Sequence, residues 1–166
     1  MKTMNLFKRI TNVPFLIAVA SVIGFSSCEK DEMDDINEDT YTLSGNATGS
    51  QVVPAVTTTA TGSISGSYNA QTNQMQYNIS WSGLAASATD SVSIYGPAAA
   101  GANGNLIGKV AVTTAGVAGS AVGGATLTEE EEESSLLDNE WYFVVGNSTT
   151  YPDGEIRGQI MTSKND

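Results

Sequence analysis

The chain has 166 residues, with 18 acidic and 7 basic side chains, one cysteine and no histidine, and its formal net charge is −11. Its length is that of a single domain, and a surface this acidic repels phosphate backbones, which argues against nucleic acid as a partner. Without histidine the chain lacks the commonest general base and the commonest transition-metal ligand, so we expect no catalytic residue, no metal and no cofactor.

Residues 1–27 have the features of a secretory signal peptide. Basic residues open the chain, an apolar segment runs from Val13 to Phe25, and small residues separate this segment from Cys28. The apolar segment is too short to span a hydrocarbon core of about 30 Å as a helix. Cys28 stands where a bacterial lipobox has its acylated cysteine, and Phe25 in place of the usual leucine resembles lipoprotein signals of the Bacteroidetes group. We therefore predict lipid attachment at Cys28, with the membrane as a partner.

Residues 28–39 form an acidic tether. Positions 29–39 hold seven acidic residues and few apolar ones, a composition that favours solvation over packing. A plain spacer explains this run. An export tag explains it equally well, because acid directly after a lipidated cysteine resembles the signal that sends Bacteroidetes lipoproteins to the outer face of the outer membrane. We expect a lipid-anchored protein of the bacterial outer membrane, exposed at the cell surface, with the periplasmic face as the alternative.

From residue 40 to residue 163 the pattern is that of one antiparallel β-domain. In its clearest segment, 74–82, every second residue from Met75 to Trp81 is apolar and the others are polar, which is typical of a half-buried strand. Similar strands are expected near 41–48, 61–68, 90–95, 105–113, 120–127, 140–147 and 154–162. About eight strands at this spacing predict an all-β fold, a Greek-key-like β-sandwich.

One segment departs from this alternation. Thr128 and Glu131 have the spacing of a capping box with Thr128 as N-cap, which predicts one short helix near 129–137. Leu136 and Leu137 would dock this helix on the domain. Five consecutive glutamates also suggest calcium, but consecutive helical residues spread around the axis, whereas a calcium site needs converging oxygens. A solvated acidic face is the better interpretation.

Three stretches together resemble one family. Residues 43–56, LSGNATGSQVVPAV, are similar to the opening of CHRD domains, the modules named after chordin. Later parts of that pattern are similar to residues 75–98, which end in IYGPA, and to the close at 154–160, GEIRGQI, and the pair Trp141-Tyr142 also fits. The resemblance covers 41–162 and implies an extracellular β-sandwich; in chordin these modules belong to an antagonist of bone morphogenetic proteins. The family-motif positions, structural or degenerate here, are Ser93, Tyr95, Gly96, Pro97, Gly146, Gly154, Glu155, Arg157 and Gly158.

The departures from the family pattern concern metal binding. The family often has His-Ile-His where this chain has Ser93-Ile94-Tyr95, and a third histidine where it has Gly146. Residues i and i+2 of a strand point the same way, so two such histidines could hold one metal ion, as the similar pattern in Cu/Zn superoxide dismutase suggests. Hydroxyl groups are poor ligands for copper or zinc. We expect any metal chemistry to be lost here; the alternative is a metal-binding or superoxide-dismutase-like sandwich with a degenerate site.

The closing motif also contains two opposite charges. Glu155 and Arg157 are two residues apart and so share one face of a strand. We predict that they pair across the sheet and fix its register, in preference to a catalytic role for the Glu155 carboxylate. Ile156 and Ile160 then face the core, and Gly158 between them allows a neighbouring backbone or ring to come close.

The leading functional hypothesis is an exported, lipid-anchored cell-envelope protein, not an enzyme, that displays a CHRD-like module. Serine, threonine, asparagine and glutamine coat the outer faces of the predicted strands, as in adhesion and glycan-contacting modules. A protein or a glycan is therefore an expected ligand. A structural envelope protein without a ligand is an equal alternative, and the sequence predicts no oligomeric state.

Overall fold

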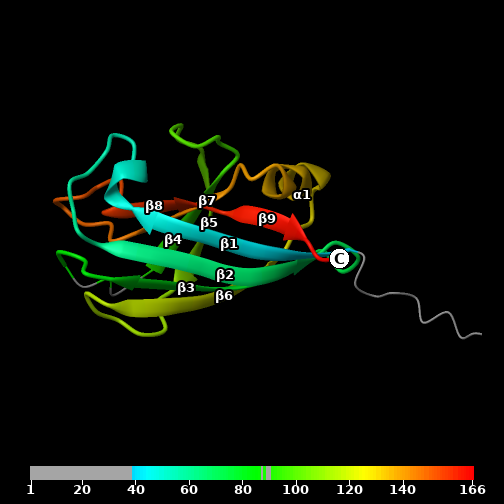
Figure 1. Ribbon diagram of the computed structural model, residues 1–166, viewed down its shortest axis with the longest axis horizontal. Helices are drawn as coiled ribbons and strands as arrows, with labels where there is room; N and C mark the ends of the chain where they lie inside the picture. Colours follow the sequence, from blue (N-terminus) through cyan, green and yellow to red (C-terminus); the bar gives the residue numbers. More distant parts are fainter. Residues whose placement is uncertain (1–38, 87, 89–90) are drawn as a thin grey trace, which may run out of the picture. The chain divides into compact units, whose positions relative to one another are not determined.

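The computed structural model describes residues 39–86, 88 and 91–166, which form an antiparallel β-structure with one short helix (Figure 1). The elements in chain order are β1 (Thr40–Thr48), the 3₁₀ turn η1 (Gly49–Gln51), β2 (Thr61–Asn69), β3 (Gln74–Ser82), β4 (Ser91–Gly96), β5 (Asn105–Ala111), β6 (Gly119–Thr126), α1 (Glu130–Leu137), β7 (Tyr142–Val145), β8 (Ile156–Gln159) and β9 (Met161–Lys164). The prediction of an all-β fold is confirmed. The signal segment, Cys28 and most of the acidic tether lie outside the described residues.

The described strands belong to one hydrogen-bonded sheet. Their order is β5-β4-β7-β8-β1-β2-β3-β6, and the short β9 pairs with β1. β3 lies near one end of this order and β4 near the other, so the chain crosses the whole sheet between them. It returns from β5 to β6, which lies beside β3, and this path is Greek-key-like. In Figure 1, β1, β2, β3 and β6 lie in front and β4, β5 and β7 lie behind, so the two layers are the halves of one curved sheet.

The strand pattern expected for residues 74–82 is confirmed in β3. Its burial alternates along the strand, and Met75, Tyr77, Ile79 and Trp81 all face the core. The segment expected as one strand over 154–162 is instead two strands, β8 and β9. They are separated at Ile160, whose backbone N–H donates to the carbonyl of Trp141 at 2.8 Å. The division arises because β8 pairs with β7, whereas β9 pairs with the first half of β1.

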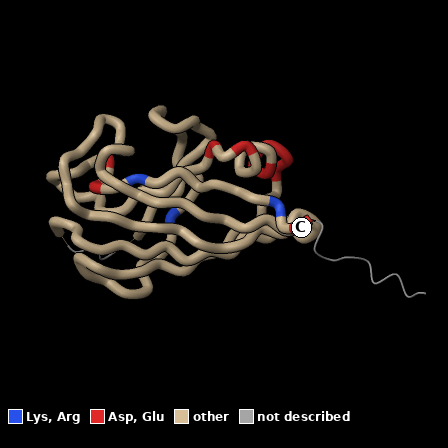
Figure 2. Tube along the Cα trace, in the orientation of Figure 1, with Lys and Arg blue, Asp and Glu red and all other residues tan. Residues whose placement is uncertain are grey.

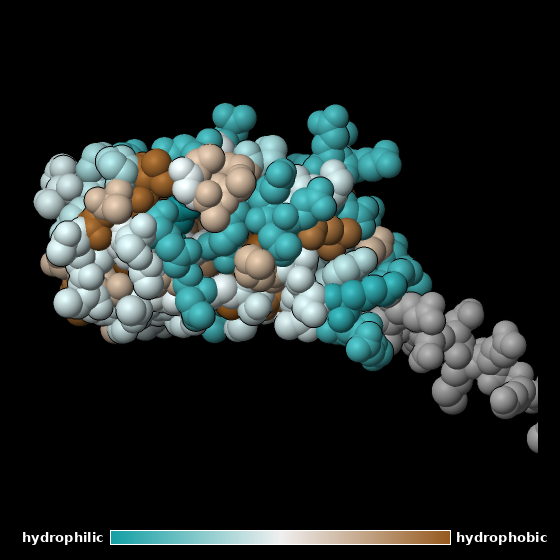
Figure 3. Space-filling model, turned by 45° about the horizontal axis from the view of Figure 1, so that its top comes forward, coloured by the Kyte–Doolittle hydropathy of each residue, from teal (hydrophilic) through white to brown (hydrophobic). Residues whose placement is uncertain are grey.

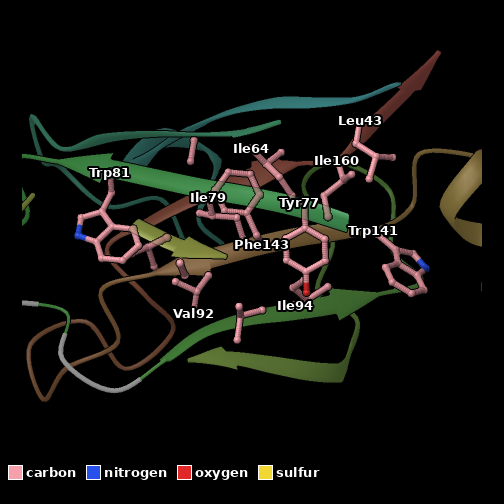
Figure 4. Close-up of a cluster of buried hydrophobic side chains, with 14 of the residues drawn as sticks. Leu43, Ile64, Tyr77, Ile79, Trp81, Val92, Ile94, Trp141, Phe143 and Ile160 are labelled. Atoms are coloured by element: carbon pink, nitrogen blue, oxygen red, sulfur yellow. The ribbon is translucent and has the colours of Figure 1, made fainter. Parts of the chain in front are cut away.

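The core lies between the two halves of the sheet. Figure 4 shows side chains from both halves meeting there, with Trp81 and Trp141 at opposite ends. Each of these large apolar side chains contributes roughly 1.5–3 kcal/mol when it is fully buried. Both indole N–H groups have acceptors: Trp81 donates to the Gly116 carbonyl at 3.1 Å, and Trp141 donates to Ser135 Oγ at 2.8 Å. The two tryptophans therefore close the core without leaving a buried donor unpaired.

Helix α1 follows the expected position but not the expected cap. The N-cap is Glu129, which makes no side-chain capping bond, so the prediction of Thr128 as N-cap is wrong by one residue. The carboxylate of Glu132 accepts a hydrogen bond from the N–H of Thr128, the residue before the N-cap, at 3.1 Å, so the predicted capping box between Thr128 and Glu131 is wrong. Leu136 is fully buried and Leu137 is partly buried against the core, as predicted. No helix of the described residues is long and apolar enough to cross a membrane.

Candidate functional site

The family-motif positions lie on β4 and β8, which flank β7, and directly beyond the ends of β4 and β7 and before β8. Val144 of β7 lies opposite Ser93 of β4 on one side and Arg157 of β8 on the other. Two residues further along β4 and β7, Tyr95 lies opposite Tyr142. The residues between them, such as Ile94, Phe143 and Ile156, are buried in the main core. Because successive strand residues point to opposite faces, the motif side chains lie on the outer face of this half of the sheet.

A stack of three side chains occupies this outer face. The Cζ atom of Arg157 lies 3.5 Å from the ring centroid of Tyr142, and the Tyr142 and Tyr95 rings stack at 5.3 Å with an interplanar angle of 12°. Since β7 lies between β4 and β8, Tyr142 is the middle member. A desolvated guanidinium over a tyrosine ring contributes about 2 kcal/mol. Tyr95, at one of the family's histidine positions, is the outer member of this stack.

Arg157 is almost fully buried, with 2% of its side chain exposed. Desolvation lowers the pKa of Arg157 from its ordinary value, and the neighbouring Tyr142 acts in the opposite direction. Its Nη1 group donates to Asn103 Oδ1 at 3.3 Å, while the buried Nη2 group has no hydrogen-bond partner among the described residues. The guanidinium still carries its charge at neutral pH because arginine does not lose its proton there.

The loop between β4 and β5 closes over this stack. The Tyr142 hydroxyl accepts a hydrogen bond from the Gly104 N–H at 3.0 Å, and Gln159 Nε2 donates to the Ala98 carbonyl at 2.9 Å. The Ala98 N–H in turn donates to the carbonyl of Glu140 at 2.8 Å. These bonds fasten the loop, and they leave the stack as a small second core that also contains Val144.

Glu155 has partners of its own on the other side of the motif. It is 1% exposed, and its Oε1 atom accepts the Thr58 hydroxyl at 2.6 Å, while Oε2 accepts the Ala85 N–H at 2.8 Å. The carboxylate thus joins the segment before β2 to the segment after β3. The predicted pair between Glu155 and Arg157 is wrong, because Glu155 precedes β8 and the two groups hold different loops.

The glycines of the motif are explained by close packing. A Cβ atom on Gly158 would lie 2.7 and 2.8 Å from two ring carbons of Phe143 and 2.8 Å from the carbonyl oxygen of Asn46, so the predicted close approach is confirmed. Gly146 has a φ of 81°, and a Cβ there would lie 2.9 Å from the Cβ of Glu155. The position of the third family histidine therefore favours glycine through its backbone as well as through its packing.

A family model, the CHRD domain, matches residues 43–160. The chain belongs to the CHRD domain family. The match begins inside β1 and continues through β8, so it includes most of the described sheet. Comparisons with curated proteins and with solved structures found no match. Membership favours a non-catalytic binding or structural module.

The donor set of this CHRD domain does not suit a transition metal at the motif. The described residues contain no cluster of three or more histidine, cysteine, aspartate or glutamate side chains that could hold a metal ion. Ser93 is buried beside Val144, and Tyr95 is half-buried against Tyr142. These two positions present hydroxyl groups, which compete poorly with nitrogen or thiolate donors for copper or zinc.

Three partners of the motif were not identified from the sequence: Tyr142, Asn103 and Thr58. Asn103 lies 54 positions from Arg157, and Thr58 lies 97 positions from Glu155, so no local spacing connects them. Tyr142 had a weak signal, since it belongs to the Trp-Tyr pair that fits the CHRD pattern. Its role as the middle of a stack depends on the order of β4, β7 and β8, which the sequence does not reveal.

Proposed function

We propose that this protein is an exported, lipid-anchored cell-envelope protein that displays its CHRD domain as a non-catalytic binding or structural module. The observation that supports this best is the use of the two buried charges in the closing motif. Glu155 accepts hydrogen bonds from Thr58 and Ala85, and Arg157 stacks on Tyr142 and donates to Asn103. Both charged groups are buried and hold loops, which supports a structural role for them.

The anchoring part of the proposal rests on the N-terminal sequence. An apolar segment ends just before Cys28, and an acidic run follows it. Each buried methylene of an acyl chain contributes about 0.8 kcal/mol of membrane affinity, and one chain alone holds a protein only marginally. A cysteine with three acyl chains would hold it durably. The acidic run would then separate the CHRD domain from the lipid surface and favour display on the outer face of the outer membrane.

The anchor is tested by Cys28→Ser in a bacterial host that processes lipoproteins. The wild-type protein is expected in the membrane fraction, with incorporation of a labelled fatty acid, whereas the variant should lose the label and leave that fraction. Ser26→Ala is the control, because it alters the same segment and keeps the thiol. Membrane association and labelling that survive in Cys28→Ser would overturn the anchor.

The non-catalytic part is tested by metal analysis of the purified wild-type chain. We expect neither copper nor zinc in stoichiometric amount, because the motif presents hydroxyl groups in place of imidazoles. One equivalent of either metal, lost on substitution of Tyr95, would favour the superoxide-dismutase-like alternative instead.

A further inference from the structure

The front half of the sheet has an outer face without charge. None of β1, β2, β3 and β6 contains an aspartate, glutamate, lysine or arginine, and Figure 2 shows these strands without a red or blue position. The pairing register aligns their outward residues in rows across the sheet. Two neighbouring rows are Asn46, Ser63, Ser80 and Ser120, and Ser44, Ser65, Asn78 and Val122. We call this surface the hydroxyl–amide face.

Two adjoining hollows lie on the hydroxyl–amide face. The first has a volume of about 510 Å³ and is lined by polar residues that include Thr48, Thr61 and Ser82. The second has a volume of about 490 Å³ and extends toward Gln51 and Gln159. Asn46 and Ser63 line both hollows, so the two form one continuous depression along the strands. Both hollows are widely open to solvent, so a ligand there would lie along the surface of the sheet and not in an enclosed pocket.

The residues that line this depression carry no charge to attract an ionic ligand. Hydroxyl and amide groups each donate and accept hydrogen bonds, and they offer no countercharge to an ion. The net charge of −11 adds a general repulsion toward anions. Protein interfaces are enriched in aromatic side chains and methionine at their centres. Here one exposed methionine, Met161, lines the second hollow at its edge on β9, and the exposed Val122 lies apart from it on β6. In Figure 3 the visible surface is mainly pale to teal, with apolar residues in separate patches.

We infer that the hydroxyl–amide face binds an extended neutral polysaccharide, a chain rich in hydroxyl groups and free of carboxylate, sulfate and phosphate. This inference deepens the proposed function and rests on it, since it names the ligand class of the displayed module. Side chains on one face repeat about every 6.6–6.8 Å along a strand, and strands lie about 4.7–4.9 Å apart, so the face offers a regular lattice of donors and acceptors.

The side chains of this lattice also lose little conformational entropy when a ligand binds. Ser63 Oγ and Ser80 Oγ lie 3.1 Å apart across β2 and β3, so these hydroxyls are already held by each other. Each keeps further capacity to donate or accept toward a ligand. Serine and threonine lose little rotamer freedom compared with long polar side chains, and binding therefore costs less entropy here than on a lysine- or glutamate-rich surface.

The test is electrophoresis of the full chain through native gels that contain one polysaccharide each. Dextran, mannan and xyloglucan are the neutral probes, and alginate is the anionic one. At least one neutral probe should retard the protein, and alginate should not. Asn46→Asp should weaken the retarding interaction by about tenfold or more, because it replaces an amide donor shared by both hollows with a charged acceptor. Asn105→Asp, the same change on exposed β5, should leave it unaltered.

The structure predicts that both variants fold. Among the described residues, the Asn46 side chain has no hydrogen-bond partner; its backbone carbonyl accepts one bond, from Gln51 Nε2 at 2.8 Å. Thermal unfolding of the variant should therefore be unchanged, and it serves as the check. Retardation by no neutral probe would overturn the inference, and so would an equal loss in Asn46→Asp and Asn105→Asp. Membrane anchoring through Cys28 is measured separately, so it can succeed while polysaccharide binding fails.

Discussion

Replacing Glu155 by glutamine tests whether its carboxylate is a structural anchor. Glutamine has nearly the same shape but only one acceptor oxygen. If that oxygen takes the place of Oε1, it keeps the Thr58 hydroxyl and the longer bond from the Ala85 N–H at 3.1 Å. The new NH₂ group then replaces Oε2, which accepted from the same N–H at 2.8 Å. One hydrogen bond to a buried charged group is lost and two donors meet. We expect the free energy of unfolding to fall by about 1.5–3 kcal/mol.

The assay is urea unfolding followed by tryptophan fluorescence, because Trp81 and Trp141 are both in the core. Asp153→Asn is the matched control: it removes the same charge two residues earlier at an exposed turn and should change the free energy by less than about 0.5 kcal/mol. In a double-mutant cycle with Thr58→Val, the two losses should not add, because the residues share a bond. A Glu155→Gln variant as stable as the wild type would refute the anchor role.

Two further predictions concern packing and pH. Gly158→Ala should lower the free energy of unfolding by roughly 1–3 kcal/mol, because the new methyl group would overlap the Phe143 ring; an unchanged urea midpoint would contradict this packing. Burial raises the pKa of Tyr77 above its usual 10.0, and burial together with the nearby Glu133 carboxylate raises the pKa of Tyr68. The folded state then holds these protons more tightly than the unfolded state, so stability should be constant below about pH 10 in this respect and fall above it. Urea midpoints at about pH 8 and about pH 11 measure the fall, and an equally steep fall in Tyr77→Phe would argue against this cause.

Most of the β-architecture was accessible from local patterns. The alternation in β3 predicts its buried face because a strand repeats every two residues, and that expectation needs no knowledge of partners. The helix near 129–137 followed from the spacing of Thr128 and Glu131, with Leu136 and Leu137 to dock it. Its cap was misplaced because the choice between Thr128 and Glu129 depends on backbone angles, and Glu129 takes the extended conformation at the start of α1.

The motif shows where local reasoning fails. Two charges two residues apart on a predicted strand suggest a pair, since the spacing gives them the same direction. The strand begins only at Ile156, however, and Glu155 stands before it with donors from two distant segments. Arg157 finds Tyr142 because β7 is inserted beside β8 in the sheet. Such partners are determined by the order of the strands in the sheet, and the spacing of nearby residues in the sequence does not reveal that order.

The sequence by itself determined the all-β class, the buried face of β3, the acidic character of the chain and the absence of imidazole at Ser93, Tyr95 and Gly146. These properties depend on residue type and on periods of two to four positions. The tertiary structure alone decided that the motif is closed by a Tyr-Tyr-Arg stack, and that serines and asparagines from β1, β2 and β3 form one uncharged depression. Both features depend on which strands become neighbours. That order is determined by long-range pairing, because the strands must together bury the whole core.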